Sequence, residues 1–120
     1  MPPIFTVCAA VPAVTELLGV APVRLFPFGE AEAGTPRPYA VWQLIGGGPQ
    51  SLLAGGADMD GYSLQLDIYA DSVDSARAVR DVLRAAIEPH ATITRFGGEQ
   101  REPATGRYRA GFDVDWLLER

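Results

Sequence analysis

A regular alternation of apolar and polar residues is the feature that most constrains the fold. Between positions 62 and 70, every second residue is apolar and the residues between are mostly polar. Successive side chains of a strand point to opposite faces, so this pattern predicts a strand with one buried face. The same alternation returns over residues 107–118. The chain is therefore expected to fold around a sheet with one covered face and one polar face.

Helical periodicity separates these two segments and also opens the chain. Residues 72–88 carry an apolar stripe at spacings of three and four, with Asp71 or Ser72 as the N-cap and Pro89 as the stop. Residues 4–18 show the same spacing, interrupted by Pro12 and followed by Gly19. A proline inside a helix removes a hydrogen bond, so we expect a kink or two short helices there.

Three further strands are expected at residues 23–26, 39–45 and 92–96, because β-branched and aromatic residues are enriched there. Both faces of the segment 39–45 are apolar, which predicts cover on both sides. We find neither a repeat nor a domain boundary. The sequence predicts one α+β domain over residues 1–120, with an antiparallel-dominated sheet of four to five strands and helices packed on one face. The helix at 72–88 could instead cross to a parallel neighbour, which leaves the strand order open.

The segment 46–59 is rich in glycine and is expected to break the strand that precedes it. It contains five glycines and one proline in fourteen residues, so we predict a loop that is ordered by a partner. The residues proposed to dock on a tail tube or connector are Gly46, Gly47, Gly48, Gln50, Leu52, Leu53 and Asp58. The alternative is that Leu52 and Leu53 fold back onto the core.

The polar face of the expected sheet is the second candidate surface. It combines arginines with carboxylates on alternate positions of two strands, and such pairs suit subunit contacts. The candidate interface residues are Asp67, Tyr69, Arg107, Arg109, Asp113 and Asp115. A solvated sheet face explains the same pattern equally well.

Composition argues against catalysis, metal binding and general nucleic-acid binding. The 120 residues include one histidine, His90, and one cysteine, Cys8, and the formal net charge is −5. A single histidine supports neither a catalytic triad nor a metal cluster, and a DNA-binding surface needs a basic excess. The glycines at 46–48 lack the lysine of a phosphate-binding loop. We therefore expect no catalytic, metal or cofactor-binding residues and no cofactor. No apolar run approaches the roughly 18 residues of a membrane span.

Several segments taken together resemble one protein family. They are the N-terminal helix from Pro3-Ile4-Phe5, the segments 38–43 and 65–70, the helix 72–88, and the closing residues 108–113. In order and spacing they resemble the tail-completion or tail-terminator proteins of long-tailed bacteriophages, prophages and gene transfer agents. The resemblance covers nearly the whole chain, and none of its motifs is catalytic.

The resemblance implies a structural protein that forms a ring, of six copies, on the end of a finished tail tube. Such a ring stops tube polymerisation and joins the tail to the head connector. The implied partners are further copies of the chain, the tail tube protein and the head–tail connector or stopper. DNA would pass through the acidic lumen without specific binding, and no membrane is involved. The implied location is the head-proximal end of the tail, with assembly in the host cytoplasm, as the absence of a signal segment also suggests.

Two alternatives remain open from the sequence. The first is a head-side connector or stopper of the same particle, which shares ring symmetry and lack of catalysis. The second is a small ligand-binding α+β domain, in which Trp42, Tyr62 and Trp116 line an apolar pocket. Core packing explains those aromatic residues without a ligand.

Overall fold

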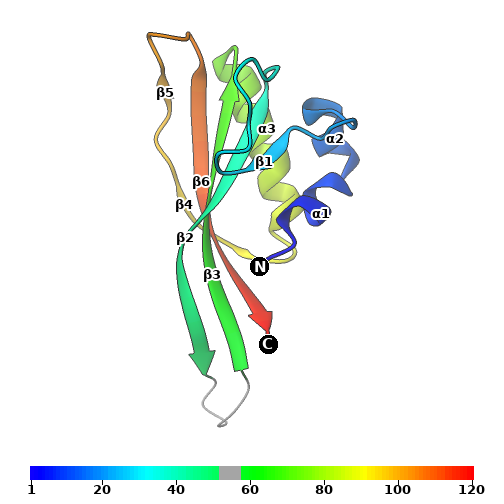
Figure 1. The fold of residues 1–120 in the computed structure, drawn as a ribbon, viewed down its shortest axis with the longest axis vertical. Coiled ribbons are helices and arrows are strands. Elements are labelled where there is room, and N and C mark those ends of the chain that lie inside the picture. Colours follow the sequence, from blue (N-terminus) through cyan, green and yellow to red (C-terminus); the bar gives the residue numbers. More distant parts are fainter. Residues whose placement is uncertain (52–57) are drawn as a thin grey trace.

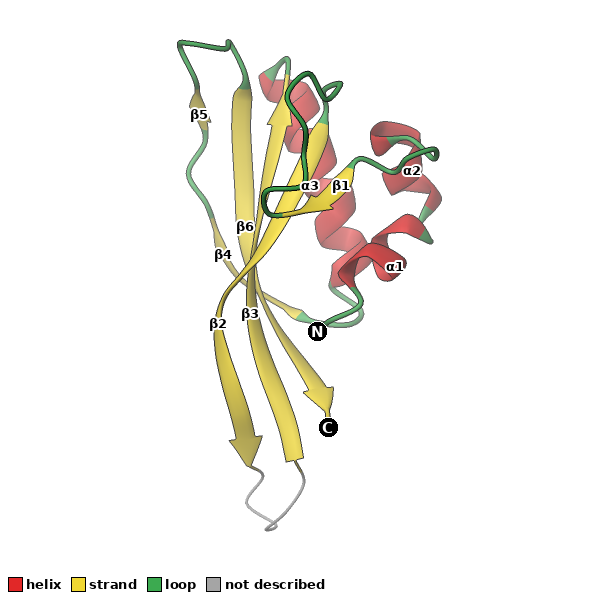
Figure 2. Ribbon diagram, viewed as in Figure 1, coloured by secondary structure: helices red, strands yellow, loops and turns green. Residues whose placement is uncertain are grey.

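A computed structural model describes residues 1–51 and 58–120 and shows an α+β fold, as the sequence predicts (Figures 1 and 2). The expected first helix is split at Pro12 into α1 (Ile4–Ala9) and α2 (Pro12–Leu18), and the third helix is α3 (Val73–Ile87). The strands are β1 (Leu25–Pro27), β2 (Tyr39–Ser51), β3 (Asp58–Ala70), β4 (Thr92–Phe96), β5 (Gln100–Arg101) and β6 (Tyr108–Glu119).

The strands form one mixed, mostly antiparallel sheet in the order β1-β2-β3-β6-β4, with β5 also paired to β6. Among the strand pairs that the structure describes, only β1 and β2 run parallel. The helix α3 leads from β3 to β4, and β6 lies between these two strands as an antiparallel neighbour of both. This arrangement settles the strand order. The short strand β5 was missed, because two polar residues within a turn-rich segment carry no periodicity.

All three helices cover the same face of the sheet (Figure 1). Side chains of α1, α2 and α3 meet the inward residues of β3 and β6 in one core, in which Phe112, Leu83 and Leu66 are fully buried. Ser72 caps α3 by accepting a hydrogen bond from the Ser75 backbone N–H (3.1 Å). None of the helices in residues 1–51 and 58–120 lies on the opposite sheet face, so the expectation that residues 39–45 are covered on both sides is wrong. Tyr39 and Val41 on that face pack among polar neighbours instead.

The glycine-bearing segment does not break β2, and this is the main correction to the sequence prediction. Residues 46–51 continue β2 and pair with residues 58–63 of β3; we call these two stretches the arm. Gly46, Gly47, Gly48 and Gln50 therefore lie in a strand, and Asp58 begins the next one, whereas Leu52 and Leu53 fall outside the described residues. The twelve cross-strand pairs of the hairpin supply the order that glycine lacks intrinsically.

The arm also explains why one glycine is needed within the strand. Gly47 has φ +144°, and a Cβ there would collide with the Gly61 carbonyl oxygen of the paired strand. A β-bulge lies just before it, between Leu44 and Gly46. The arm projects beyond the helices and gives the molecule extents of 51 × 27 × 23 Å (Figure 1). The chain is thus elongated, with two distinct ends.

Candidate assembly surfaces

The helix-free side of the sheet carries a continuous polar network, which we call the polar face. Cross-strand pairing places its side chains in rows, because paired residues in neighbouring strands point to the same side. The residues of the polar face are Tyr39, Gln43, Ser63, Gln65, Asp67, Tyr69, Arg95, Arg107, Arg109, Asp113 and Asp115. All six candidate interface residues therefore lie on one face, as their alternation predicts.

The centre of the polar face is the ion pair of Arg109 with Asp67. Arg109 Nε lies 3.6 Å from Asp67 Oδ1, and both side chains are partly buried. Burial raises the pKa of Asp67; Arg109 opposes this rise, and nearby Asp113 adds to it. Gln43 Nε2 donates to Gln65 Oε1 (3.4 Å) in the adjacent row. Arg109 is therefore the main group that opposes the rise in the pKa of Asp67.

Arg107 forms the most densely bonded cluster of this surface. One nitrogen donates to Tyr39 Oη (2.7 Å), and another contacts Glu102 Oε2 at 2.8 Å. Its guanidinium also lies 4.8 Å from the centroid of the Tyr69 ring, which stacks on Tyr39 at 5.2 Å. The hydrogen bond from Arg107 lowers the pKa of Glu102, and burial raises the pKa of the Tyr69 hydroxyl. This cluster ties the start of β6 to β2 and β3.

The remaining carboxylates of the polar face are also paired within the chain. Arg95 of β4 contacts Asp113 at 3.4 Å, and Ser63 donates to Asp115 at 2.8 Å. The alternation places Arg107 and Arg109 on the same face as Asp113 and Asp115, but the structure pairs these acids with residues of other strands. Arg95 and Tyr39 were missed as members of the polar face, although the alternation of their strands would have placed them on this side. Glu102 was missed as the partner of Arg107.

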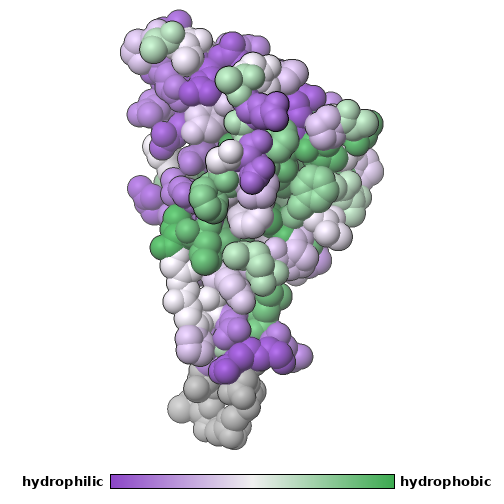
Figure 3. Space-filling model, in the orientation of Figure 1, coloured by the Kyte–Doolittle hydropathy of each residue, from purple (hydrophilic) through white to green (hydrophobic). Residues whose placement is uncertain are grey.

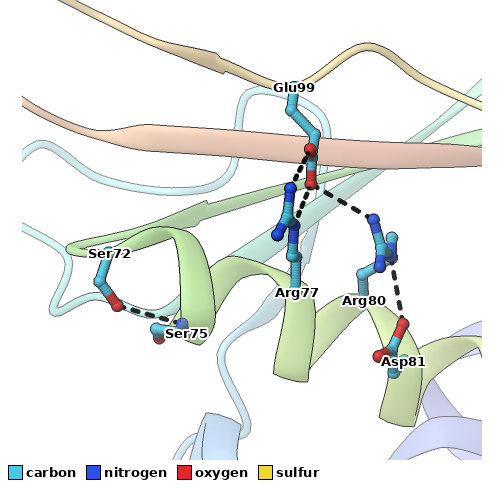
Figure 4. A network of polar contacts seen from close by, with 6 residues as sticks. All are labelled: Ser72, Ser75, Arg77, Arg80, Asp81 and Glu99. Atoms are coloured by element: carbon cyan, nitrogen blue, oxygen red, sulfur yellow. Dashed lines mark hydrogen bonds and ion pairs between the residues drawn. The ribbon is translucent and has the colours of Figure 1, made fainter.

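A second network fastens the β4–β5 segment to α3 (Figure 4). Glu99 accepts two hydrogen bonds from Arg77, both 2.8 Å, and one from Arg80 at 3.4 Å. These contacts lower the pKa of Glu99, with the Arg77 hydrogen bonds as the largest cause. Arg80 and Arg84 also stand over Phe96, whose side chain stays 53% exposed. The outer strand is therefore anchored on its helix side while its outer edge remains open.

The sheet has two edges, and each is open over part of its length. On one side, β1 pairs only with Ala40, Val41 and Trp42 of the thirteen-residue β2. On the other side, β4 ends the strand order and pairs only with β6. Leu44 and Ile45, next to the open part of β2, are 45% and 49% exposed. Figure 3 shows hydrophobic surface at this bend of β2, above the arm.

The other residues singled out from the sequence have structural surroundings. Cys8 is fully buried, and burial raises the pKa of its thiol to about 12. Trp116 is 3% exposed within the core and stacks against the exposed His90 (ring centroids 6.2 Å apart). Over residues 1–51 and 58–120, no group of His, Cys, Asp or Glu gathers to hold a metal ion. None of the described helices is both long and apolar enough to span a bilayer.

Together these features define a small α+β protein whose prominent surfaces are a charged sheet face, two partly open edges and a projecting arm. The profile of the family described as "Tail completion protein gp17" matches residues 2–119. The chain belongs to this family and is therefore a structural component of a phage-type tail rather than an enzyme. A search of curated proteins gives no match.

A comparison with solved structures supports the fold. The chain is similar to a chain in the structure titled "Virion of native gene transfer agent (GTA) particle", with a TM-score of 0.64 and 11% sequence identity. The match covers 98% of this chain and 92% of that chain. At this identity the similarity establishes a shared fold over nearly the full length of both chains.

Proposed function

We propose that the chain is a tail terminator, which forms a ring of six copies on the head-proximal end of the tail tube. The observation that carries this proposal is the family match over residues 2–119. The ring would stop tube polymerisation, because the occupied tube end no longer presents a free face. It would then join the tail to the head connector, and DNA would pass through its lumen without specific binding.

The proposed partners fit the two ends of the elongated chain. At one end the arm, with Gly46, Gly47, Gly48, Gln50 and Asp58, extends beyond the helices and is the proposed docking element for the tube or the connector. At the other end lie the N-terminus of α3 and the turn between β5 and β6 (Figure 1). A terminator needs two such separate contact regions, because it touches the tube on one side and the connector on the other.

The polar face is proposed to take part in the contacts between copies. One of its rows reaches both free edges of the sheet: it begins at Gln43 on the free part of β2, crosses Gln65 and Asp113, and ends at Arg95 on β4. Contacts between neighbouring strands hold the side chains of this face in place, and they involve Asp67, Arg107, Arg109 and Asp115. The whole chain, residues 1–120, is proposed to act as a single domain in this assembly.

Quantitative mass spectrometry of purified, DNA-filled particles tests the proposal, with a known ring protein as the copy-number standard. We expect about six copies per particle, and tails purified without heads should retain them. Presence on heads alone would instead identify a head-side stopper. Absence from intact particles, with abundant protein in the lysate, would exclude both locations.

A further inference from the structure

The two free edges of the sheet lie at the same level, and this is the starting point of the inference. Cross-strand pairing joins Gln43, Gln65, Asp113 and Arg95 in one row across β2, β3, β6 and β4. The next rows join Leu44 to Ile93 and Gly46 to Thr92 in the same way. The free part of β2 and the strand β4 are therefore opposite ends of the same rows.

The directions of the two edge strands are also compatible. Each of the pairs β2–β3, β3–β6 and β6–β4 is antiparallel, so β4 runs antiparallel to β2. In a ring whose axis lies along the strands, rotation keeps these directions. The β4 edge of one copy and the β2 edge of the next then meet as an antiparallel pair, without a shift along the axis.

We propose that β4 of one copy pairs with residues Gln43–Gly46 of β2 in the next copy, so that the sheet continues from copy to copy around the ring. The proposal rests on the proposed ring and specifies the surface that closes it. Gln43 would face Arg95, Leu44 would face Ile93, and Gly46 would face Thr92 of the neighbouring copy. The side chains on each side of the sheet match in kind, since Leu44 and Ile93 both point to the helix side.

Features at both edges favour a short, specific pairing. A Cβ on Gly46 would meet nothing within 4 Å, so another backbone can approach closely there. The exposed Leu44, Ile45 and Phe96 provide apolar surface that such a contact would bury. On the N-terminal side of Gln43, strand β1 already occupies the edge of β2. On the C-terminal side of Gly46, Pro49 has no backbone N–H to donate. The pairing is thus confined to a few residues, which protects the edge against unlimited association.

Disulfide trapping in assembled particles tests the pairing. Directly opposed residues of an antiparallel pair have Cβ atoms about 4.5–5.5 Å apart, close to the separation that a disulfide requires. We expect the double variant Gln43→Cys/Arg95→Cys to give an oxidant-dependent ladder of linked chains up to the full ring on non-reducing gels. The matched control, Gln43→Cys/Ala85→Cys, places its second thiol on the exposed side of α3 and should give no ladder. The native Cys8 is buried in both variants.

The outcomes separate this pairing from the ring itself. If wild-type particles contain about six copies and the double variant is incorporated without cross-links, the edge pairing is wrong and the ring stands. If the double variant is not incorporated, the single variants Gln43→Cys and Arg95→Cys are produced together, and the pairing then requires linked dimers in the particles. A mixture without dimers overturns the pairing, whereas absence of the wild-type chain from particles overturns the ring proposal.

Discussion

At the residue scale, Glu102 is the carboxylate most clearly stabilised in its ionised form by a neighbour on the polar side of the molecule. The hydrogen bond from Arg107 lowers the pKa of Glu102 below its ordinary value of 4.5. Its contribution to folding is therefore present above pH 4.5 and is lost as the pH falls through the lower, folded-state pKa. We expect Glu102→Gln to reduce the free energy of unfolding by up to about 1 kcal/mol at pH 7.

Urea titrations of the wild type and Glu102→Gln, from pH 7 to pH 3, measure this effect. The difference between the two proteins should shrink below pH 4.5. Glu32→Gln serves as the control for the loss of one carboxylate, because the Glu32 side chain makes no hydrogen bond or ion pair with the described residues. The control should leave the free energy of unfolding at pH 7 unchanged. A difference that persists unchanged at pH 3 would assign the loss of stability to packing.

Asp67 acts in the opposite sense to Glu102. Burial raises the pKa of Asp67, so its own contribution to stability increases as the pH falls towards that pKa.

Arg109 gives the corresponding test of subunit contact. Arg109→Glu replaces its ion pair with Asp67 by two adjacent carboxylates, on a face where Asp113 already raises the Asp67 pKa. We expect the variant to fold, with unchanged far-ultraviolet circular dichroism, but to be lost from particles. Arg101→Glu makes the same change of net charge at an exposed site on β5 and should be incorporated. Normal incorporation of Arg109→Glu would remove the polar face from the subunit contacts. Arg107 is less suitable, because its reversal also breaks the bonds to Tyr39 and Glu102.

Only part of this residue-level detail is accessible from sequence. Alternation fixes which side of a strand a residue occupies, and so it predicted that Asp67, Arg109 and Asp113 share a face. Partners depend on strand order and register, which are long-range properties. Arg95 therefore could not be assigned to Asp113, although the strand 92–96 was predicted with its observed bounds.

At the element scale, the arm shows where local propensity fails. Gly46, Gly47 and Gly48 are poor strand formers, and the sequence predicted a loop, yet β2 continues through them because β3 supplies a complete partner. The helices were predicted well, since capping, periodicity and proline act within a few residues. The extension of β2, in contrast, depends on pairing with β3, and a short stretch of sequence around the glycines does not contain that partner.

Two neighbouring glycines allow a matched test of the arm. Gly47 has φ +144° and no room for a Cβ, whereas a Cβ on Gly48 would meet nothing within 4 Å. We expect Gly47→Ala to destabilise the hairpin by about 1–3 kcal/mol and to speed amide exchange in residues 58–63. Gly48→Ala should leave exchange there within twofold of the wild type. Equal exchange in the two variants would show that the backbone at Gly47 is not restrictive.

At the scale of the whole molecule, edge pairing determines which face of the sheet lines a ring. The helices form a thick layer on one face, and in a closed ring the outer side offers the longer circumference. The polar face would then point to the lumen, and it would take part in the contacts between copies at the edges of the sheet, where one of its rows ends at Gln43 and Arg95. Each copy carries a net charge of −5, and Arg109 and Arg95 of this face are paired with Asp67 and Asp113. An arginine that is paired with a carboxylate attracts DNA phosphate only weakly, so DNA would pass through the lumen without being retained.

Neutralising these carboxylates should therefore convert the lumen into a DNA-binding surface. The triple variant Asp67→Asn, Asp113→Asn and Asp115→Asn removes the acidic partners of Arg109 and Arg95. We expect it to bind duplex DNA at low salt and to release it as salt rises, measured by fluorescence anisotropy, because each phosphate contact displaces counterions. The control Asp74→Asn, Asp81→Asn and Glu88→Gln makes the same change in net charge on α3 and should bind no better than the wild type. Equal DNA binding by the two triple variants would show that net charge alone, rather than an inward-facing polar surface, governs the passage of DNA.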